Sequence, residues 1–338
     1  MQEKKKIRPR TITMTTSMEV PIARGTVEYI AGINPEETWA PVLGEDIDED
    51  GQRALGNKHL EMIREAEQTE EYKQKLGEFM KETVTLFQAI TKGDKETMSP
   101  YTGGKKFNFV LGMPRTGGTT VYNALSSAYG WPWEKLLFSM THNMMPNALF
   151  VQPNPYSEFD MGWRLPWNFN NVVFELCQFL VYAKREAPDS QHVFIKSTPL
   201  SYAIKMLNYL FADQAQYVVT VRHPGAIALT KNTGEEVRRE DHLEVMSMWA
   251  NLYSSIVREC RPLGNILLVE YGDKMTEFIN SIFEKKKYGS RAEETAFFEY
   301  DEYDKDFYNS DIVQRSFDYV RNSWKLFGMD FPIPEKCI

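Results

Sequence analysis

The chain has 338 residues and a formal net charge of -8, with 42% hydrophobic and 25% charged residues, which are ordinary proportions for a folded protein. Acidic residues outnumber basic ones and are spread along the chain, so we expect no nucleic-acid partner and no broad basic face. An anionic ligand would have to be held by a local pocket.

The sequence contains no apolar run of about 18 residues, and its basic N-terminal segment, MQEKKKIRPR, is not followed by an apolar stretch. We therefore predict a cytoplasmic protein that is not secreted and has no membrane partner. The cysteines Cys177, Cys260 and Cys337 are scattered, which argues against a disulfide framework and against a zinc site.

Residues 1–106 are expected to form an irregular arm followed by a helical extension. The first 54 residues lack sustained periodicity, whereas apolar residues recur at helical spacing from Leu55 to Ile90 and predict one or two amphipathic helices. The segment from Thr91 to Lys106 is rich in turn-forming residues and is predicted to be a linker.

Residues 107–338 alternate short apolar runs with helical patterns. The predicted strands are FNFVLG from Phe107, HVFIK from His192, QYVVTV from Gln216 and NILLVEY from Asn265. Nearly every position in these runs is β-branched or aromatic, which is typical of strands covered on both faces. We predict an α/β domain of three layers, with a central parallel sheet flanked by helices.

An aromatic, proline-rich stretch at residues 131–171 interrupts this alternation after the first strand and helix. Long loops of this kind in α/β proteins usually line the ligand crevice. We expect the stretch to be a lid or an acceptor-binding segment.

The first strand leads into a glycine-rich turn and the start of a helix, in the segment FNFVLGMPRTGGTT at residues 107–120. Glycines let backbone amides point at a ligand, and the helix N-terminus adds partial positive charge. The segment therefore predicts a site for a phosphate or sulfate group in a fold of the P-loop type.

The loop departs from the nucleoside-triphosphate template G-x-x-x-x-G-K-[ST] at one decisive position. Gly112, Gly117 and Thr119 are in register, but Gly118 stands where the template has lysine. The cation lies three residues earlier, at Arg115. A kinase or triphosphatase of this fold needs that lysine and a metal-binding aspartate, so the pattern argues against both.

A second anion motif is predicted in QYVVTVRHPGAIALT, at residues 216–230. The strand ends at Arg222, and Pro224 can start a helix. Thr230 is eight residues after Arg222, about two helical turns, so both side chains could reach one dianionic group. Two arginines at two strand ends, with no acid there, predict an anion site that requires no metal.

Together these motifs resemble the sulfotransferases that use 3′-phosphoadenosine 5′-phosphosulfate (PAPS). PRTGGT at 114–119 is similar to their 5′-phosphosulfate loop, and RHPGAIALT at 222–230 is similar to their 3′-phosphate motif. KSTP at 196–199 resembles their lysine-bearing strand end, and VEYGDKM from Val269 resembles the strand whose tyrosine lies near the adenine. The resemblance spans about 107–283.

The resemblance implies roles for individual residues. Arg115 would contact the transferred sulfuryl group and the leaving phosphate, Lys196 would place a second cation near the bridging oxygen, and Tyr271 would lie against the adenine. The implied phosphate contacts are Thr116, Gly117, Gly118, Thr119 and Thr120 for the 5′-phosphate, and Arg222 and Thr230 for the 3′-phosphate.

An alcohol acceptor must lose a proton, which calls for a general base close to the sulfur. Many cytosolic members of the family carry a histidine where this chain has Thr198, and a threonine hydroxyl is not a base at neutral pH. Other branches use a glutamate after the first helix, and Glu134 falls in a comparable region. His142, in the same segment, is the alternative, and the choice stays open.

We therefore expect transfer of a sulfuryl group from PAPS to a hydroxyl or amino group of a small-molecule acceptor, with release of 3′-phosphoadenosine 5′-phosphate. One alternative is a nucleotide or small-molecule kinase, which predicts magnesium-dependent binding of ATP. Another is a non-catalytic nucleotide-binding scaffold, which Thr198 supports. The acceptor and the oligomeric state are not predicted.

Overall fold

The computed structural model describes residues 24–33, 49–131, 169–197, 199–231, 239–260, 265–286 and 305–332. These residues form a mixed α/β protein around a four-stranded, all-parallel sheet in the order β2-β1-β3-β4. The predicted α/β class, with a parallel sheet flanked by helices, is confirmed. The strands are β1 (Lys106–Gly112), β2 (His192–Lys196), β3 (Ala215–Val221) and β4 (Ile266–Glu270).

The centre of the sheet is β1, whose residues 107–112 are all buried. Phe109 pairs with Ile195 of β2 on one side and with Tyr217 of β3 on the other. β4 ends the described sheet and is only partly covered, with Leu267 45% exposed. The prediction that each strand is covered on both faces is therefore wrong for β4, because an apolar run does not reveal that its strand lies at an edge.

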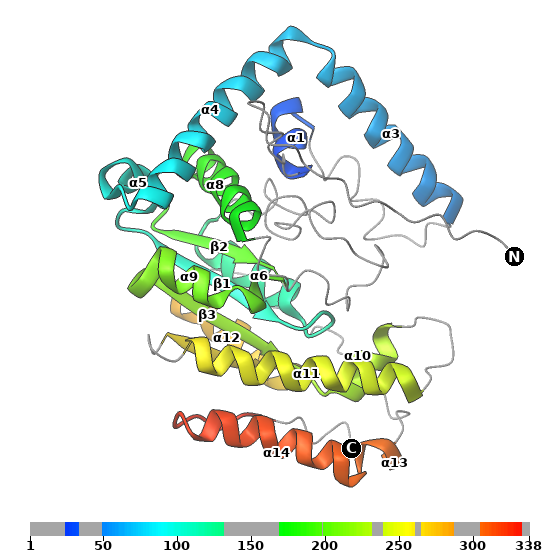
Figure 1. Ribbon diagram of the computed structural model, residues 1–338. Coiled ribbons are helices and arrows are strands. Elements are labelled where there is room, and N and C mark those ends of the chain that lie inside the picture. The colour runs from blue at the N-terminus through cyan, green and yellow to red at the C-terminus, as the bar shows by residue number, and fades with distance from the viewer. Residues whose placement is uncertain are drawn as a thin grey trace, which may run out of the picture.

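Helices lie on both faces of the sheet (Figure 1). α6 (Gly118–Ala128) and α12 (Asp273–Lys286) lie on one face, and α9 (Ile204–Phe211) and α11 (Arg239–Cys260) lie on the other. α14 (Asp311–Lys325) packs on α11 as an outer layer. The remaining elements after β2 are η3 (Pro199–Tyr202), η4 (Ala212–Gln214), α10 (Pro224–Lys231) and α13 (Lys305–Tyr308).

Aromatic side chains fix α9 against the sheet. The Phe211 ring of α9 lies 4.1 Å from the ring of Phe107 and 5.6 Å from that of Phe109, between ring centroids. Tyr217 of β3 stacks on Phe109 at 5.7 Å. Such rings bury large apolar areas and prefer offset or tilted contacts, so this cluster sets the position of the strands that carry the candidate site.

Helices also precede the sheet, as the periodicity from Leu55 to Ile90 predicted. They are α1 (Arg24–Ala31), α3 (Glu49–Glu67), α4 (Glu70–Lys92) and α5 (Lys95–Thr102). The prediction of an irregular arm over the first 54 residues is wrong at residues 24–31 and from residue 49, where helices form without a long periodic pattern. α3 and α4 confirm the amphipathic helices expected from the periodicity. The prediction of a linker at residues 91–106 is wrong where α5 forms, because Asp94 caps a short helix by accepting a hydrogen bond from the Thr97 amide at 3.2 Å.

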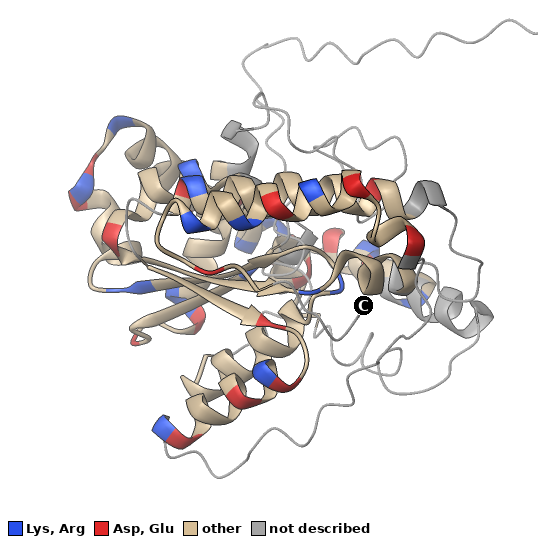
Figure 2. Cartoon of the chain, turned by 90° about the horizontal axis from the view of Figure 1, so that it is seen from below, with Lys and Arg blue, Asp and Glu red and all other residues tan. Residues whose placement is uncertain are grey.

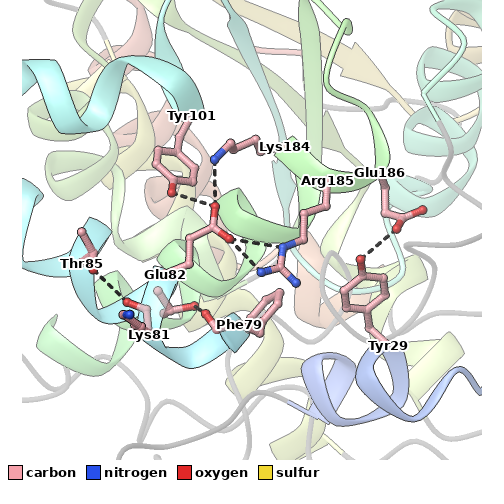
Figure 3. A network of polar contacts seen from close by, with 10 residues as sticks. Tyr29, Phe79, Lys81, Glu82, Thr85, Tyr101, Lys184, Arg185 and Glu186 are labelled. Carbon is pink, nitrogen blue, oxygen red and sulfur yellow. Dashed lines mark hydrogen bonds and ion pairs between the residues drawn. The ribbon is translucent and has the colours of Figure 1, made fainter. Parts of the chain in front are cut away.

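A shared carboxylate joins these helices to α8 (Phe169–Glu186), which leads into β2 (Figure 3). Glu82 of α4 accepts hydrogen bonds from Lys184 at 2.9 Å and from Arg185 at 2.8 Å, both on α8. It also accepts one from the Tyr101 hydroxyl of α5 at 2.8 Å. Three helices are thereby connected through one side chain.

α1 is attached to the same helix. Tyr29 donates to Glu186 at 2.9 Å, and Thr26 donates to Gln178 at 2.8 Å (Figure 3 shows the first pair).

Of the segment 131–171 predicted as a lid, residues 132–168 lie outside the described residues, and positions 169–171 open α8. None of the described helices combines the length and the apolar character needed to span a membrane.

Candidate functional site

The candidate residues meet at the edge of the sheet where the strands end. β1, β2, β3 and β4 are parallel, so their carboxyl ends lie at one edge. Lys196 ends β2, Arg222 follows β3 directly, and Tyr271 follows β4 directly. In open α/β sheets, ligands bind in the crevice at this edge.

Basic residues gather near the edge where the strands end. Figure 2 shows Lys and Arg mixed with Asp and Glu along the described helices, while the strands are mostly uncharged. Three basic residues nevertheless lie at or after the ends of three adjacent strands. Lys196 ends β2, Arg115 is in the loop after β1, and Arg222 follows β3. The fourth strand instead ends in Glu270, which is paired with Lys274, so the basic residues belong to the β2-β1-β3 part of this edge.

The loop from β1 to α6 contains backbone conformations that favour anion binding. Gly112, Arg115 and Gly117 have φ values of 141°, 63° and 79°. Positive φ values in a tight loop let successive backbone amides converge on one point. Gly117 is the N-cap of α6 and has no side chain to cap the helix, so residue 117 does not compete with an anion for the amides of the first helical turn.

Close packing explains why the loop carries glycine at residue 117. A Cβ on Gly117 would lie 2.7 Å from the sulfur of Met275 and 3.0 Å from Cδ2 of Tyr271. At Gly118 a Cβ would lie 3.6 Å from Cε of Lys196, which is an ordinary contact. The Lys196 side chain therefore runs alongside the start of α6, next to the loop.

Hydroxyl groups attach the loop to β3. Thr116 is 1% exposed, and its hydroxyl donates to the carbonyl of Met113 at 2.7 Å. The same hydroxyl oxygen lies 2.7 Å from that of Thr220, which is also within hydrogen-bond distance of the Leu111 carbonyl. Because its hydroxyl is used within the fold, Thr116 would contact a phosphate through its backbone amide.

Arg222 joins the two predicted anion motifs directly. Its Nη1 donates to the backbone carbonyl of Arg115 at 3.0 Å, and the residue is 4% exposed. The guanidinium carbon lies 4.1 Å from the centre of the Tyr271 ring, a cation–π contact. The Arg222 carbonyl accepts from the Trp249 indole at 2.9 Å, so backbone and side chain are both anchored.

The supporting residues on α11 were not anticipated from the sequence. Trp249 contacts Arg222, and the Tyr253 hydroxyl donates to the carbonyl of Thr220 at 2.7 Å. Thr220 was also missed, although a threonine inside an apolar strand, two residues before Arg222, is a usable signal. Since side chains two apart on a strand share a face, Thr220 points to the same side of the sheet as the position of Arg222.

His223 shapes the turn after β3 from a fully buried position. Its Nδ1 accepts a hydrogen bond from the amide of Gly225 at 3.1 Å, and its ring packs 4.9 Å from that of Tyr308. Burial, and secondly the neighbouring His242, lower the pKa of His223 to about 3. The imidazole is therefore neutral at pH 7 and serves as an acceptor in the turn.

The structure describes only some of the other predicted site residues. Thr119 and Thr120 lie in the first turn of α6, where Thr119 is exposed. Thr230 lies in α10, but its side chain is outside the described set. Both general-base candidates, Glu134 and His142, lie outside the described residues, as does Thr198.

A buried acid on α8 was not anticipated either. Glu175 is 2% exposed, and neither carboxylate oxygen has a hydrogen-bond partner within the described part of the chain. Burial raises the pKa of Glu175 well above its ordinary value, so the carboxyl is held in its protonated form.

Comparisons with models of protein families, with curated proteins and with solved structures found no match for this chain.

Proposed function

We propose that this chain is a PAPS-dependent sulfotransferase with a fold of the P-loop type. It would move the sulfuryl group of PAPS to a hydroxyl or amino group of a small-molecule acceptor and release 3′-phosphoadenosine 5′-phosphate. The main support is a loop that carries Gly118 in the lysine position and Arg115 within it, with Lys196 and Arg222 at the ends of the two strands that pair with β1.

In the proposed reaction, the acceptor oxygen or nitrogen forms a bond to sulfur while the bond from sulfur to the bridging oxygen breaks. Negative charge grows on that oxygen and leaves with the 5′-phosphate. Arg115 and Lys196 are the proposed groups that stabilise this charge, and a fixed donor of this kind lowers a barrier by about 3–4 kcal/mol. The acceptor proton would pass to a general base, for which Glu134 and His142 are the candidates.

In the same proposal, the amides of the loop and of the first turn of α6 hold the 5′-phosphate. Arg222, with Thr230, binds the 3′-phosphate, and Tyr271 lies beside the adenine. No metal ion is part of this arrangement, because the cations of the chain take the place that magnesium and lysine share in kinases.

Calorimetric titration of the full chain tests the donor class. We expect 3′-phosphoadenosine 5′-phosphate to bind at least tenfold more tightly than ADP with magnesium. Arg222→Ala should lose most of the preference for the 3′-phosphate, while the control Arg315→Ala, which removes an exposed arginine on α14, should keep it. Tighter binding of ADP with magnesium would favour the kinase instead.

Mass spectrometry across a panel of alcohols, phenols and amines tests transfer itself. A sulfated product that forms only with PAPS supports the enzyme, and Glu134→Gln or His142→Gln should then lower the rate for hydroxyl acceptors. Tight donor binding without any product would favour the scaffold.

A further inference from the structure

The two predicted anion motifs are in physical contact, although they are 107 residues apart in the chain. The contact runs from the Arg222 guanidinium to a carbonyl of the loop, the one belonging to Arg115. A residue expected to bind one phosphate therefore already holds part of the loop expected to bind the other.

The carbonyl that Arg222 holds belongs to the most strained residue of the loop. Arg115 has φ 63°, and a left-handed conformation costs a residue with a Cβ more than it costs glycine. The Arg115 side chain is exposed, so the residue is not held by burial of that side chain. The hydrogen bond from Arg222 acts on the backbone, where the strain lies.

Arg222 is itself fixed before it reaches the loop. Tyr271 packs against its guanidinium, Trp249 binds its carbonyl, and only 4% of its surface is exposed. A guanidinium has five N–H donors in a rigid plane, so one bond to a carbonyl is compatible with a paired contact to a phosphate. A phosphate that fixes this plane would also fix the carbonyl of Arg115.

We propose that Arg222 is a positioning residue for the phosphate loop in addition to its role at the second phosphate, so that the two anion sites are coupled. This inference rests on the proposed function. Occupation of the second site aligns the loop amides for the first, and a donor without the 3′-phosphate loses this alignment as well as one direct contact.

The coupling has a consequence that a simple ligand role does not share. If Arg222 only binds the 3′-phosphate, its removal leaves the affinity for 5′-AMP unchanged, because 5′-AMP has no 3′-phosphate. If Arg222 also holds the loop, its removal weakens 5′-AMP too. We expect a loss of about tenfold, within the usual range for coupled sites.

The experiment titrates 5′-AMP and 3′-phosphoadenosine 5′-phosphate into the full-length wild type, Arg222→Ala and Arg222→Lys. We expect Arg222→Ala to weaken both ligands. Arg222→Lys should recover most of the 5′-AMP affinity, because an ammonium group can donate to the Arg115 carbonyl. It should recover less of the affinity for the bisphosphate, because lysine lacks the paired donors of a guanidinium.

Unchanged 5′-AMP binding in Arg222→Ala would overturn the coupling while leaving the proposed donor class intact. Equal loss of 5′-AMP affinity in the lysine and alanine variants would also overturn it, because a general structural defect predicts no rescue. Failure of the wild type to prefer the bisphosphate over ADP with magnesium would reject the proposed function itself. Truncation of this buried side chain should lower the unfolding temperature of Arg222→Ala, so the titrations are made at a temperature where circular dichroism shows all three proteins to be folded.

Discussion

At the scale of single residues, the loop after β1 contains two adjacent glycines that differ in backbone conformation and in the space around them. Gly117 combines a positive φ with close neighbours on α12 and after β4, whereas Gly118 begins a helix and has room for a Cβ. The two positions look alike in the sequence, and they differ only in the folded chain, by backbone conformation and by packing.

A matched pair of alanine variants tests this difference. Gly117→Ala should lower the free energy of unfolding by about 1–3 kcal/mol, because the left-handed backbone is strained and Met275 must move. Gly118→Ala should change it by less than about 0.5 kcal/mol. Urea denaturation of both variants measures the effect, and equal losses would show that the loop does not hold residue 117 in this conformation.

Protonation of His223 should make the stability of the folded protein depend on pH. Its folded-state pKa of about 3 lies below the value near 6.5 expected in the unfolded chain, so the unfolded state binds the proton first. The stability contributed by the neutral imidazole is present above pH 6.5 and is lost as the pH falls toward 3. Between pH 7 and pH 5 the loss should reach about 2 kcal/mol.

His223→Asn isolates this contribution, because asparagine keeps an acceptor for the Gly225 amide and does not titrate. Denaturant unfolding of wild type and variant at pH 7, 6 and 5 should give a flatter pH dependence for the variant. Parallel curves for the two proteins would contradict the assignment.

At the scale of elements, α8 connects the N-terminal helices to the sheet. It leads into β2 and also carries the basic residues that meet Glu82 of α4. Partial burial by itself raises the pKa of Glu82, but hydrogen bonds from Lys184, Arg185 and Tyr101 bring it below its ordinary value. The ionised carboxylate is therefore the form that stabilises this interface.

Replacement of Glu82 by Gln should destabilise the protein by about 1 kcal/mol at pH 7, a modest value because the side chain is 23% exposed and partly screened. The difference from wild type should shrink as the pH falls below the ordinary glutamate value and through the lowered pKa of Glu82, where the wild-type carboxylate becomes protonated. Glu78→Gln, at an exposed position of the same helix, is the control. A difference that grows in acid would contradict the role of the ionised form.

At the scale of the whole molecule, ligand binding and folding are linked. The proposed ligand contacts come from segments that follow all the described strands, so the site exists only when the sheet is assembled. A ligand that binds only the folded state adds about 2.7 kcal/mol to the free energy of unfolding at 100 times its dissociation constant.

We therefore expect 3′-phosphoadenosine 5′-phosphate to raise the unfolding temperature in a concentration-dependent way. Adenosine, which carries neither phosphate, should leave the temperature almost unchanged. Differential scanning calorimetry with both ligands measures this, and equal stabilisation by adenosine would mean that the anion contacts contribute little.

Several elements could be predicted because their determinants are local. β1, the loop after it and α6 follow from an apolar run, glycines and a helical pattern that are adjacent in the chain. The amphipathic helices α3 and α4 follow from periodicity alone. α5 was missed although its cap, Asp94, is also local, because turn-forming residues surround it.

Short stretches of the chain were enough to predict the strand-loop-helix unit, the alternation of strands with crossover helices, and the basic residues near the strand ends, because each of these is encoded locally. Three features required the folded chain: the position of β4 at the edge of the described sheet, the pairing of the Thr116 hydroxyl with Thr220, and the hydrogen bond from Arg222 to the Arg115 carbonyl. These contacts join residues about a hundred positions apart, and such pairings depend on strand order and side-chain direction, which short-range patterns do not encode.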